Sequence, residues 1–303
     1  MMTSNKNKLE LRHLHHPKVR DLAWALGTPS LVNHQKGLPM LSSEWWTQEF
    51  LNAQDWLLEL DRDPSSLLTY LDPNRGRRIG LAFEDLLRCW LDWHPEYSCL
   101  ATDIPIYDGK RTVGAFDFLI QTPDDVLHLE VAVKYYLCLE NSQDWVNWIG
   151  PSRRDHLGKK LTKMRDRQLQ LLLTPLGQQC LQEHQLPYPT KVAGTIKGIF
   201  FQYWGGEDIV PMSCHTVDGI WMFCEDFVGI YRDCHEDCRF VERIRPDWLA
   251  PLQLQEVNDF DTDGVFAPIM LSQMIYESSL RMWVEKQRIV VVPDHWDQME
   301  RVL

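Results

Sequence analysis

The feature that most constrains the fold is a pair of strand-like runs separated by a four-residue turn. Residues 113–121 and 126–139 are rich in β-branched and aromatic side chains, and the turn between them reads Thr122-Pro123-Asp124-Asp125. If these four residues are the whole loop, the runs pair as an antiparallel hairpin. Asp117 then lies directly opposite Glu130, with the two Cβ atoms about 5 Å apart.

This register gives the hairpin two faces, because side chains alternate along a strand. The face expected to pack on the core carries Phe116, Phe118, Ile120, Leu127, Leu129, Val131 and Val133. The other face is mixed and carries Ala115, Asp117, Leu119, His128, Glu130, Ala132 and Lys134.

The two opposed acids of the mixed face indicate a metal site. Two carboxylates on a half-buried sheet repel each other, and desolvation adds to the cost, so the pair is favoured chiefly when a cation lies between them. Magnesium or manganese ions take carboxylate oxygens and keep water molecules for chemistry. The alternatives are an exposed hairpin on which both acids are simply solvated, or a register that differs by one residue and separates them.

The hairpin belongs to a run of elements in the order helix, three strands, helix, strand. Apolar residues at a period near 3.6 predict an amphipathic helix over 79–93, and a first strand follows at about 99–106. After the hairpin come a long helical pattern over 155–173 and a β-rich segment over 192–204. Glu84 borders the apolar stripe of the first helix, so a third acid is expected to point inward.

The flanking segments have different patterns. Short helices are predicted over about 17–27, from Ser43 to Leu58, and over 65–71, and a turn cluster at 72–76 ends this region. The last hundred residues predict short strands and one helix, at about 219–224, 227–231 and 288–292 for the strands and 270–286 for the helix. The chain therefore divides into an N-terminal helical lobe over 1–72, an α/β core over 73–205 and an α+β extension over 206–303 that packs on the core.

These residues resemble the PD-(D/E)XK nuclease superfamily. Glu84 matches its helical acid, Asp117 in Gly114-Ala115-Phe116-Asp117 matches its hairpin aspartate, and Glu130 matches its second metal-binding acid. The whole length is similar to a bacterial family of proteins of uncharacterised function assigned to that superfamily. The resemblance implies an α/β fold with a restriction-endonuclease-like αβββαβ core. It also implies a metal-dependent nuclease in which Asp117, Glu130 and Glu84 hold magnesium or manganese.

The lysine of the superfamily pattern is displaced. It is expected two residues after the second acid, where Ala132 stands, and the next lysine on that face is Lys134. Four residues of extended strand span about 13 Å, so Lys134 reaches the site only if its stem bends back or a bulge shortens the path. We take Lys134 as the catalytic lysine beside Asp117 and Glu130. The alternative is a catalytically degenerate protein that binds nucleic acid or a protein partner without cleavage.

Charge limits how nucleic acid can bind. With 31 basic and 43 acidic residues, the formal net charge of −12 repels a polyanion, so contact needs a local basic patch. One helix supplies seven cations, which are Arg153, Arg154, Lys159, Lys160, Lys163, Arg165 and Arg167. Phosphates are expected there, the alternative being a solvated helix face. Gln168 follows, and the resemblance places such a polar residue toward the site. A protein partner would contact the N-terminal lobe or the acidic C-terminal part.

Several function classes have no sequence support. The chain has no P-loop, no Rossmann glycine fingerprint and no Gly-x-Ser-x-Gly elbow, which removes the signals for nucleotide hydrolysis, dehydrogenation and α/β-hydrolase chemistry. No apolar run approaches the length of a membrane helix, and the eight scattered cysteines suit reduced thiols. We therefore expect a cytoplasmic protein with no membrane contact.

Overall fold

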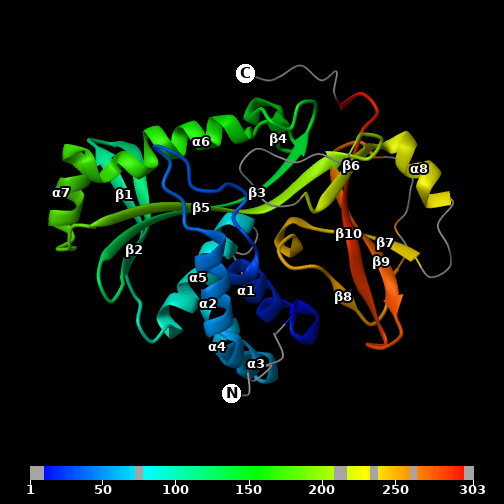
Figure 1. Ribbon diagram of the computed structural model, residues 1–303, viewed down its shortest axis with the longest axis horizontal. Coiled ribbons are helices and arrows are strands. Elements are labelled where there is room, and N and C mark those ends of the chain that lie inside the picture. Colours follow the sequence, from blue (N-terminus) through cyan, green and yellow to red (C-terminus); the bar gives the residue numbers. More distant parts are fainter. Residues whose placement is uncertain are drawn as a thin grey trace, which may run out of the picture.

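A single mixed sheet forms the frame of the molecule (Figure 1). The computed structural model describes residues 10–71, 78–207, 217–232, 238–258, 260 and 265–296. Within them the sheet has ten strands: β1 Ser98–Asp108, β2 Arg111–Gln121, β3 Val126–Cys138, β4 Trp148–Ile149, β5 Lys191–Tyr203, β6 Gly219–Phe223, β7 Cys238–Glu242, β8 Gln253–Leu254, β9 Ile269–Glu277 and β10 Met282–Val292. The main path runs β1-β2-β3-β5-β6-β10-β9-β7, while β4 pairs with β3 and β8 with β10. The α/β class is therefore confirmed.

The predicted hairpin register is present in the structure. Strand β2 pairs with β3 through Phe118↔Leu129 and Gln121↔Val126, and the Thr122 amide donates to the Asp125 carbonyl across the four-residue turn at 2.8 Å. Strand β3 then runs parallel to β5, which runs parallel to β6. The same register that places Asp117 near Glu130 therefore anchors the centre of the sheet.

The helices follow the predicted order, with different boundaries in places. Helix α5, Ile79–Trp93, has the predicted bounds. The N-terminal region forms the 3-10 turn η1 Leu11–His13 and the helices α1 Pro17–Gly27, α2 Ser43–Asn52, α3 Gln54–Arg62 and α4 Ser65–Tyr70. The long helix predicted from Ser43 therefore breaks at Ala53. The turn cluster at 72–76 lies outside the described residues.

The helix predicted over 155–173 is wrong in extent. Helix α6 covers only Leu157–Asp166, and the chain continues as the 3-10 segment η4, Gln168–Leu173, and then helix α7, Pro175–Glu183. Arg167 separates α6 from η4 with φ −128° and ψ −63°, values outside the helical region. The break changes the direction in which Gln168 points.

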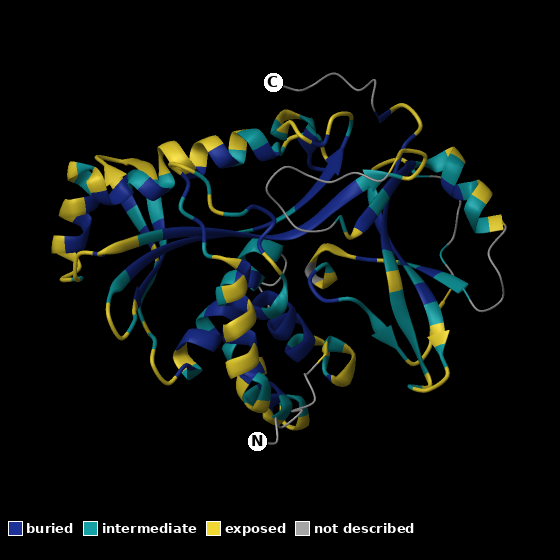
Figure 2. Cartoon of the chain, viewed as in Figure 1, coloured by how far each residue is buried: buried dark blue, intermediate teal, exposed yellow. Residues whose placement is uncertain are grey.

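Helices cover both faces of the sheet (Figures 1 and 2). Helices α1 to α5 pack on one face, against residues such as Phe118, Leu129 and Val131. Helix α6 packs on the opposite face through Leu157, Leu161 and Met164, and η4 and α7 continue that layer. As Figure 2 shows, the middle of the sheet is therefore buried on both sides.

The expectation that only one face of the hairpin is core is consequently wrong. Leu119, His128 and Glu130 on the mixed face are fully buried. Phe116 also lies on this face, where its ring meets that of His128 at a centroid distance of 4.9 Å. Strict alternation is therefore interrupted near Asp117, and Asp103, which lies opposite it on β1, has a left-handed φ of 52°.

The C-terminal segment extends the same sheet. Strand β10 pairs in parallel with β6 and antiparallel with β9, so the sheet crosses residue 206 without a break in pairing. Two predictions here are wrong: residues 227–231 lie in helix α8, Cys224–Arg232, and residues 270–286 form most of the β9–β10 hairpin. Cross-strand pairing outweighs local propensity in such segments. No helix within the described ranges is long and apolar enough to span a membrane.

A lysine is buried between the sheet and the N-terminal helices. Lys197 of β5 is fully buried, donates to the Thr28 carbonyl and lies over the Trp46 ring with 4.0 Å between Nζ and the ring centroid. No carboxylate is among these contacts. Burial therefore lowers the pKa of Lys197 well below 10.5, which favours the neutral amine in the folded protein.

Replacement of Lys197 by methionine should change how stability depends on pH. Below about pH 10, Lys197 binds a proton in the unfolded chain but not in the folded chain. The contribution of Lys197 to stability therefore rises with pH in this range. Relative to Lys197→Met, the wild-type free energy of unfolding should rise by up to about 1.4 kcal/mol per pH unit between pH 7 and pH 10. Urea denaturation measures it, with Lys110→Met at the exposed β1–β2 turn as the control. A constant difference between wild type and Lys197→Met would contradict the burial argument.

Candidate functional site

Two carboxylates meet where the β2–β3 ladder ends. Regular pairing stops at Phe118↔Leu129, and the next opposed pair is Asp117 and Glu130. The Asp117 side chain takes the place of a backbone acceptor, because its Oδ2 accepts the Val131 amide at 3.0 Å. Each of the two carboxyl groups affects the pKa of the other, so Asp117 and Glu130 are electrostatically coupled. The structure places the two acids beside each other at the end of the ladder.

Two neutral side chains hold the Glu130 carboxylate. His128 Nε2 lies 2.8 Å from Glu130 Oε1, and Gln168 Nε2 donates to Oε2 at 2.5 Å. Burial lowers the pKa of His128 to about 4, so the ring is neutral at neutral pH and its proton is best placed on Nε2, facing the carboxylate. Both donors fix the orientation of Glu130 while leaving lone pairs on each oxygen.

A lysine faces the acid pair from helix α6. Lys160 Nζ donates to Gln168 Oε1 at 3.0 Å, so Gln168 bridges the lysine and Glu130. Lys160 attracts both Asp117 and Glu130 electrostatically, although in the described part of the chain no carboxylate oxygen lies within 4.0 Å of its Nζ. Burial lowers the pKa of Lys160, and the two acids oppose that shift.

The two acids hold protons unusually tightly. Burial, followed by repulsion from Glu130, raises the pKa of Asp117 to about 7, and burial raises the pKa of Glu130 to about 7. Near neutral pH the pair therefore retains a proton in the absence of another cation. A donor set of two adjacent carboxylates fits a hard divalent cation, which commonly takes one or two protein carboxylates together with water and substrate oxygens.

Glu84 does not complete the expected set of three ligands. It is half-buried on α5, and the described residues contain no group of three or more His, Cys, Asp or Glu side chains placed to hold a metal ion. The sequence prediction of a three-carboxylate cage is therefore wrong for Glu84. Helical periodicity places a residue beside the apolar stripe, yet it does not say how far the helix lies from the hairpin.

Lys134 points to a different partner. Its Nζ donates to Asp155 Oδ2 at 2.6 Å, and Tyr136 donates to Asp155 Oδ1 at 3.2 Å. The ion pair with Asp155 accounts for the position of Lys134, so neither a bent-back stem nor a bulge toward Glu130 has to be invoked. The structure thus brings together Asp117, Glu130 and Gln168 but directs Lys134 to Asp155.

The predicted phosphate-binding residues separate into three groups. Lys159, Lys163 and Arg167 are exposed along one side of α6 and line a groove of about 660 Å³. The other residues of this groove are Val146, His156, Gly158, Thr162 and Asp166. Arg154 is exposed before the helix, whereas Lys160 faces the acid pair.

Arg153 has a structural contact that the sequence does not predict. Its guanidinium donates to the Trp296 carbonyl at 2.9 Å and lies 5.1 Å from the centroid of the Trp296 ring. This contact ties the segment before α6 to the end of the described chain. As a phosphate contact, Arg153 is therefore less available than the exposed residues of the α6 groove.

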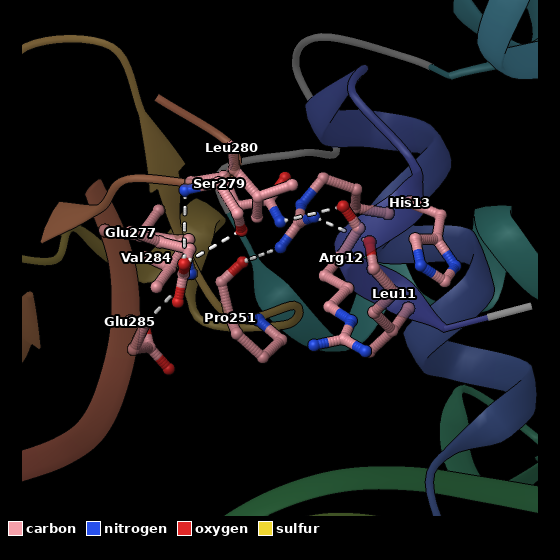
Figure 3. A pocket seen from close by; sticks show the side chains of 12 residues that line it. Leu11, Arg12, His13, Pro251, Glu277, Ser279, Leu280, Val284 and Glu285 are labelled. Carbon is pink, nitrogen blue, oxygen red and sulfur yellow. Dashed lines mark hydrogen bonds between the residues drawn. The ribbon is translucent and has the colours of Figure 1, made fainter. Parts of the chain in front are cut away.

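Another cavity, of about 610 Å³, lies away from these acids between the N-terminal region and the β9–β10 hairpin (Figure 3). Arg20 donates there to the carbonyls of Leu11 and Pro251. Glu285 accepts from Arg243 and Arg288 nearby. Backbone carbonyls therefore satisfy Arg20, and two arginines neutralise Glu285, which indicates a structural role for these contacts.

Asparagine at position 117 should stabilise the metal-free protein at alkaline pH. Both acids have pKa values near 7 in the folded chain and near 4 in the unfolded chain, so the stability they contribute is complete below pH 4 and is lost as pH rises through 7. Relative to Asp117→Asn, the wild-type free energy of unfolding should fall by about 1–3 kcal/mol between pH 5 and pH 8. The asparagine side chain can still accept the Val131 amide.

Urea denaturation in the presence of a chelator checks this expectation. Asp124→Asn, in the exposed turn of the same hairpin, is the matched control and should keep the wild-type slope. Equal slopes for wild type and Asp117→Asn would show that the acids do not share a desolvated site.

Comparisons with known proteins give one match. Neither the curated proteins nor the solved structures contain a match to this chain. Residues 20–303 match a protein family described as a domain of unknown function, DUF1853, which includes both carboxylates, helix α6 and the C-terminal strands. The chain therefore belongs to the DUF1853 family.

Proposed function

We propose that this protein is a metal-dependent phosphodiesterase that cleaves nucleic acid and is built on a restriction-endonuclease-like core. The observation that carries the proposal is the juxtaposition of half-buried Asp117 and fully buried Glu130 on adjacent strands, with Gln168 and Lys160 beside them. The order α5, β1, β2, β3, α6, β5 agrees with the αβββαβ core that the resemblance implies.

Asp117 and Glu130 would hold magnesium or manganese in this proposal. The bound ion supplies a water of lowered pKa and offsets negative charge on the phosphate. His128 and Gln168 keep the Glu130 carboxylate in one orientation, since each donates to a different oxygen. Asp117 is held in turn by the Val131 amide, so the chain presents both carboxylates without further rearrangement.

The exposed cations of α6 would hold the phosphate backbone. Lys159, Lys163 and Arg167 line one groove, and Asp166 within it is already paired with Arg165 at 2.6 Å. The groove is therefore locally positive in a chain of net charge −12. Such a patch allows a polyanion to bind in one place while the rest of the surface repels it. Reduced cysteines and this substrate class suit a cytoplasmic protein.

A second candidate function is nucleic-acid or protein binding without cleavage. The position of Lys134 favours it, because the lysine that the sequence assigns to catalysis is paired with Asp155. The absence of a third acidic ligand among the described residues favours it too. In that case the N-terminal lobe and the acidic C-terminal part would be the surfaces for a protein partner.

A manganese-dependent cleavage screen over single- and double-stranded DNA and RNA tests the first candidate. The wild-type protein should cleave at least one of these substrates, and Asp117→Asn and Glu130→Gln should each lose about 100-fold or more of the rate because each removes a metal ligand. Asp124→Asn should retain the wild-type rate. Nucleic-acid binding with no cleavage under any divalent ion would select the second candidate.

Alanine at Lys163 or Arg167 should weaken nucleic-acid binding in a salt-dependent way. Each lost phosphate contact should lower the slope of log affinity against log salt by about 1, because fewer counterions are released. Fluorescence anisotropy across a salt series measures that slope. Lys110→Ala at the β1–β2 turn serves as the control, and unchanged slopes for the α6 variants would remove the groove from the binding surface.

A further inference from the structure

We propose that Lys160 of helix α6, and not Lys134, supplies the ammonium group that contacts the reacting phosphate or the attacking water at the Asp117–Glu130 pair. This inference rests on the proposed function. It adds a catalytic residue from an element other than the strand on which the sequence pattern expects one.

The side chain of Lys160 is directed toward the sheet. It lies three residues from Leu157 and four from Met164, and both are buried against the sheet. Residues three and four apart lie on the same side of a helix, so Lys160 flanks this buried stripe, where it is half-buried. Lys159 and Lys163 are exposed on the other side of the helix. Only Lys160 of these three lysines is therefore directed at the sheet.

A hydrogen bond to Gln168 holds Lys160 in place. Gln168 accepts from Lys160 Nζ with its oxygen and donates to Glu130 Oε2 with its nitrogen. An amide used in this way sets the separation of an ammonium group and a carboxylate without letting them collapse into an ion pair. The break at Arg167 makes this possible, because it turns Gln168 out of the line of helix α6.

Lys160 does not form an ion pair with either acid. Lys160 attracts both acids, yet in the described part of the chain its Nζ has no carboxylate oxygen within 4.0 Å. A half-buried ammonium group that stops short of two acids retains donors for another acceptor. A phosphate oxygen or a water molecule between them would satisfy the remaining donors, since the ammonium group has three.

Lys134 lacks that freedom. Its Nζ is bonded to Asp155 Oδ2 at 2.6 Å, and the other oxygen of Asp155 is bonded to Tyr136. A shift of Lys134 toward Glu130 would break a charge-assisted bond and leave Asp155 with the tyrosine alone. Lys134 therefore serves to position strand β3 against the segment before α6.

The chemistry assigned to Lys160 is electrostatic. In hydrolysis one water is consumed: its oxygen forms a bond to phosphorus and it loses one proton to solvent, while the bond from phosphorus to the leaving sugar oxygen breaks and that oxygen takes one proton from solvent. Negative charge grows on the phosphate oxygens and the leaving oxygen during this step. A fixed ammonium group beside them stabilises the transition state more than the ground state, which raises kcat and leaves KM nearly unchanged.

Three lysine-to-methionine variants test the assignment under the manganese conditions that give wild-type cleavage. Lys160→Met should lower kcat about 100-fold or more and change KM by less than about 3-fold. Lys159→Met, the adjacent exposed lysine, should raise KM with little change in kcat. Lys134→Met should retain kcat within about 10-fold. Lys160→Arg keeps the charge and should recover part of the lost rate.

Stability and binding measurements separate the possible failures. Urea denaturation of Lys160→Met and Lys160→Arg shows whether either variant is unfolded, and Lys160→Gln is a further polar variant for the kinetics. A near wild-type kcat for Lys160→Met, or a large loss confined to Lys134→Met, would overturn the assignment and leave the proposed nuclease intact. No cleavage by the wild-type protein on any substrate would overturn both.

Discussion

Desolvation of two neighbouring carboxylates is the constraint on which the site depends. Asp117 and Glu130 lie on adjacent strands of a sheet covered by helices on both faces, and burial raises both of their pKa values to about 7. Replacing one of them with a neutral residue would lower the free energy of the folded chain. The presence of both acids therefore indicates a functional role. The surrounding donors, His128, Gln168 and the Val131 amide, hold the acids in this costly arrangement.

The rest of the sheet makes such an arrangement possible. Strand β3 is central, with β2 and β5 on its two sides, and the C-terminal strands continue the sheet beyond β6. The contacts of Arg20 with Pro251 and of Arg153 with Trp296 tie the first helix and the α6 region to the C-terminal part. A single continuous frame can hold buried charges in fixed positions because their displacement would disturb packing on both faces.

Turn residues and hydrophobic periodicity predict the elements whose form depends on neighbouring residues in the sequence. The four-residue turn and the alternation of the hairpin are enough to place Asp117 opposite Glu130, and period 3.6 is enough for helix α5. The β9–β10 hairpin at 270–286 is predicted as a helix, and its strands are held in the sheet by β6 and β7, which lie tens of residues earlier in the chain. Phe116 lies on the face opposite to the one that alternation predicts, in contact with His128.

The candidate site shows the same division. Glu84 and Lys134 are placed by spacing on their own elements, but the distance between elements decides whether they reach the acids, and the structure directs Lys134 to Asp155. Lys160 is one of seven cations in its region by sequence, and only the packing of α6 on the sheet distinguishes it from Lys159. The signal that separates them is the spacing from the buried residues Leu157 and Met164, since Lys160 flanks them and is half-buried whereas Lys159 is exposed.

We propose above all that Asp117 and Glu130 form one site for a hard divalent cation. A crystal structure of the protein soaked in manganese, with anomalous diffraction data, tests it most directly. We expect an anomalous peak from a manganese ion that carboxylate oxygens of both Asp117 and Glu130 bind at about 2.0–2.2 Å. Density without a peak between these side chains at millimolar manganese, or a peak bound by other residues alone, would contradict it.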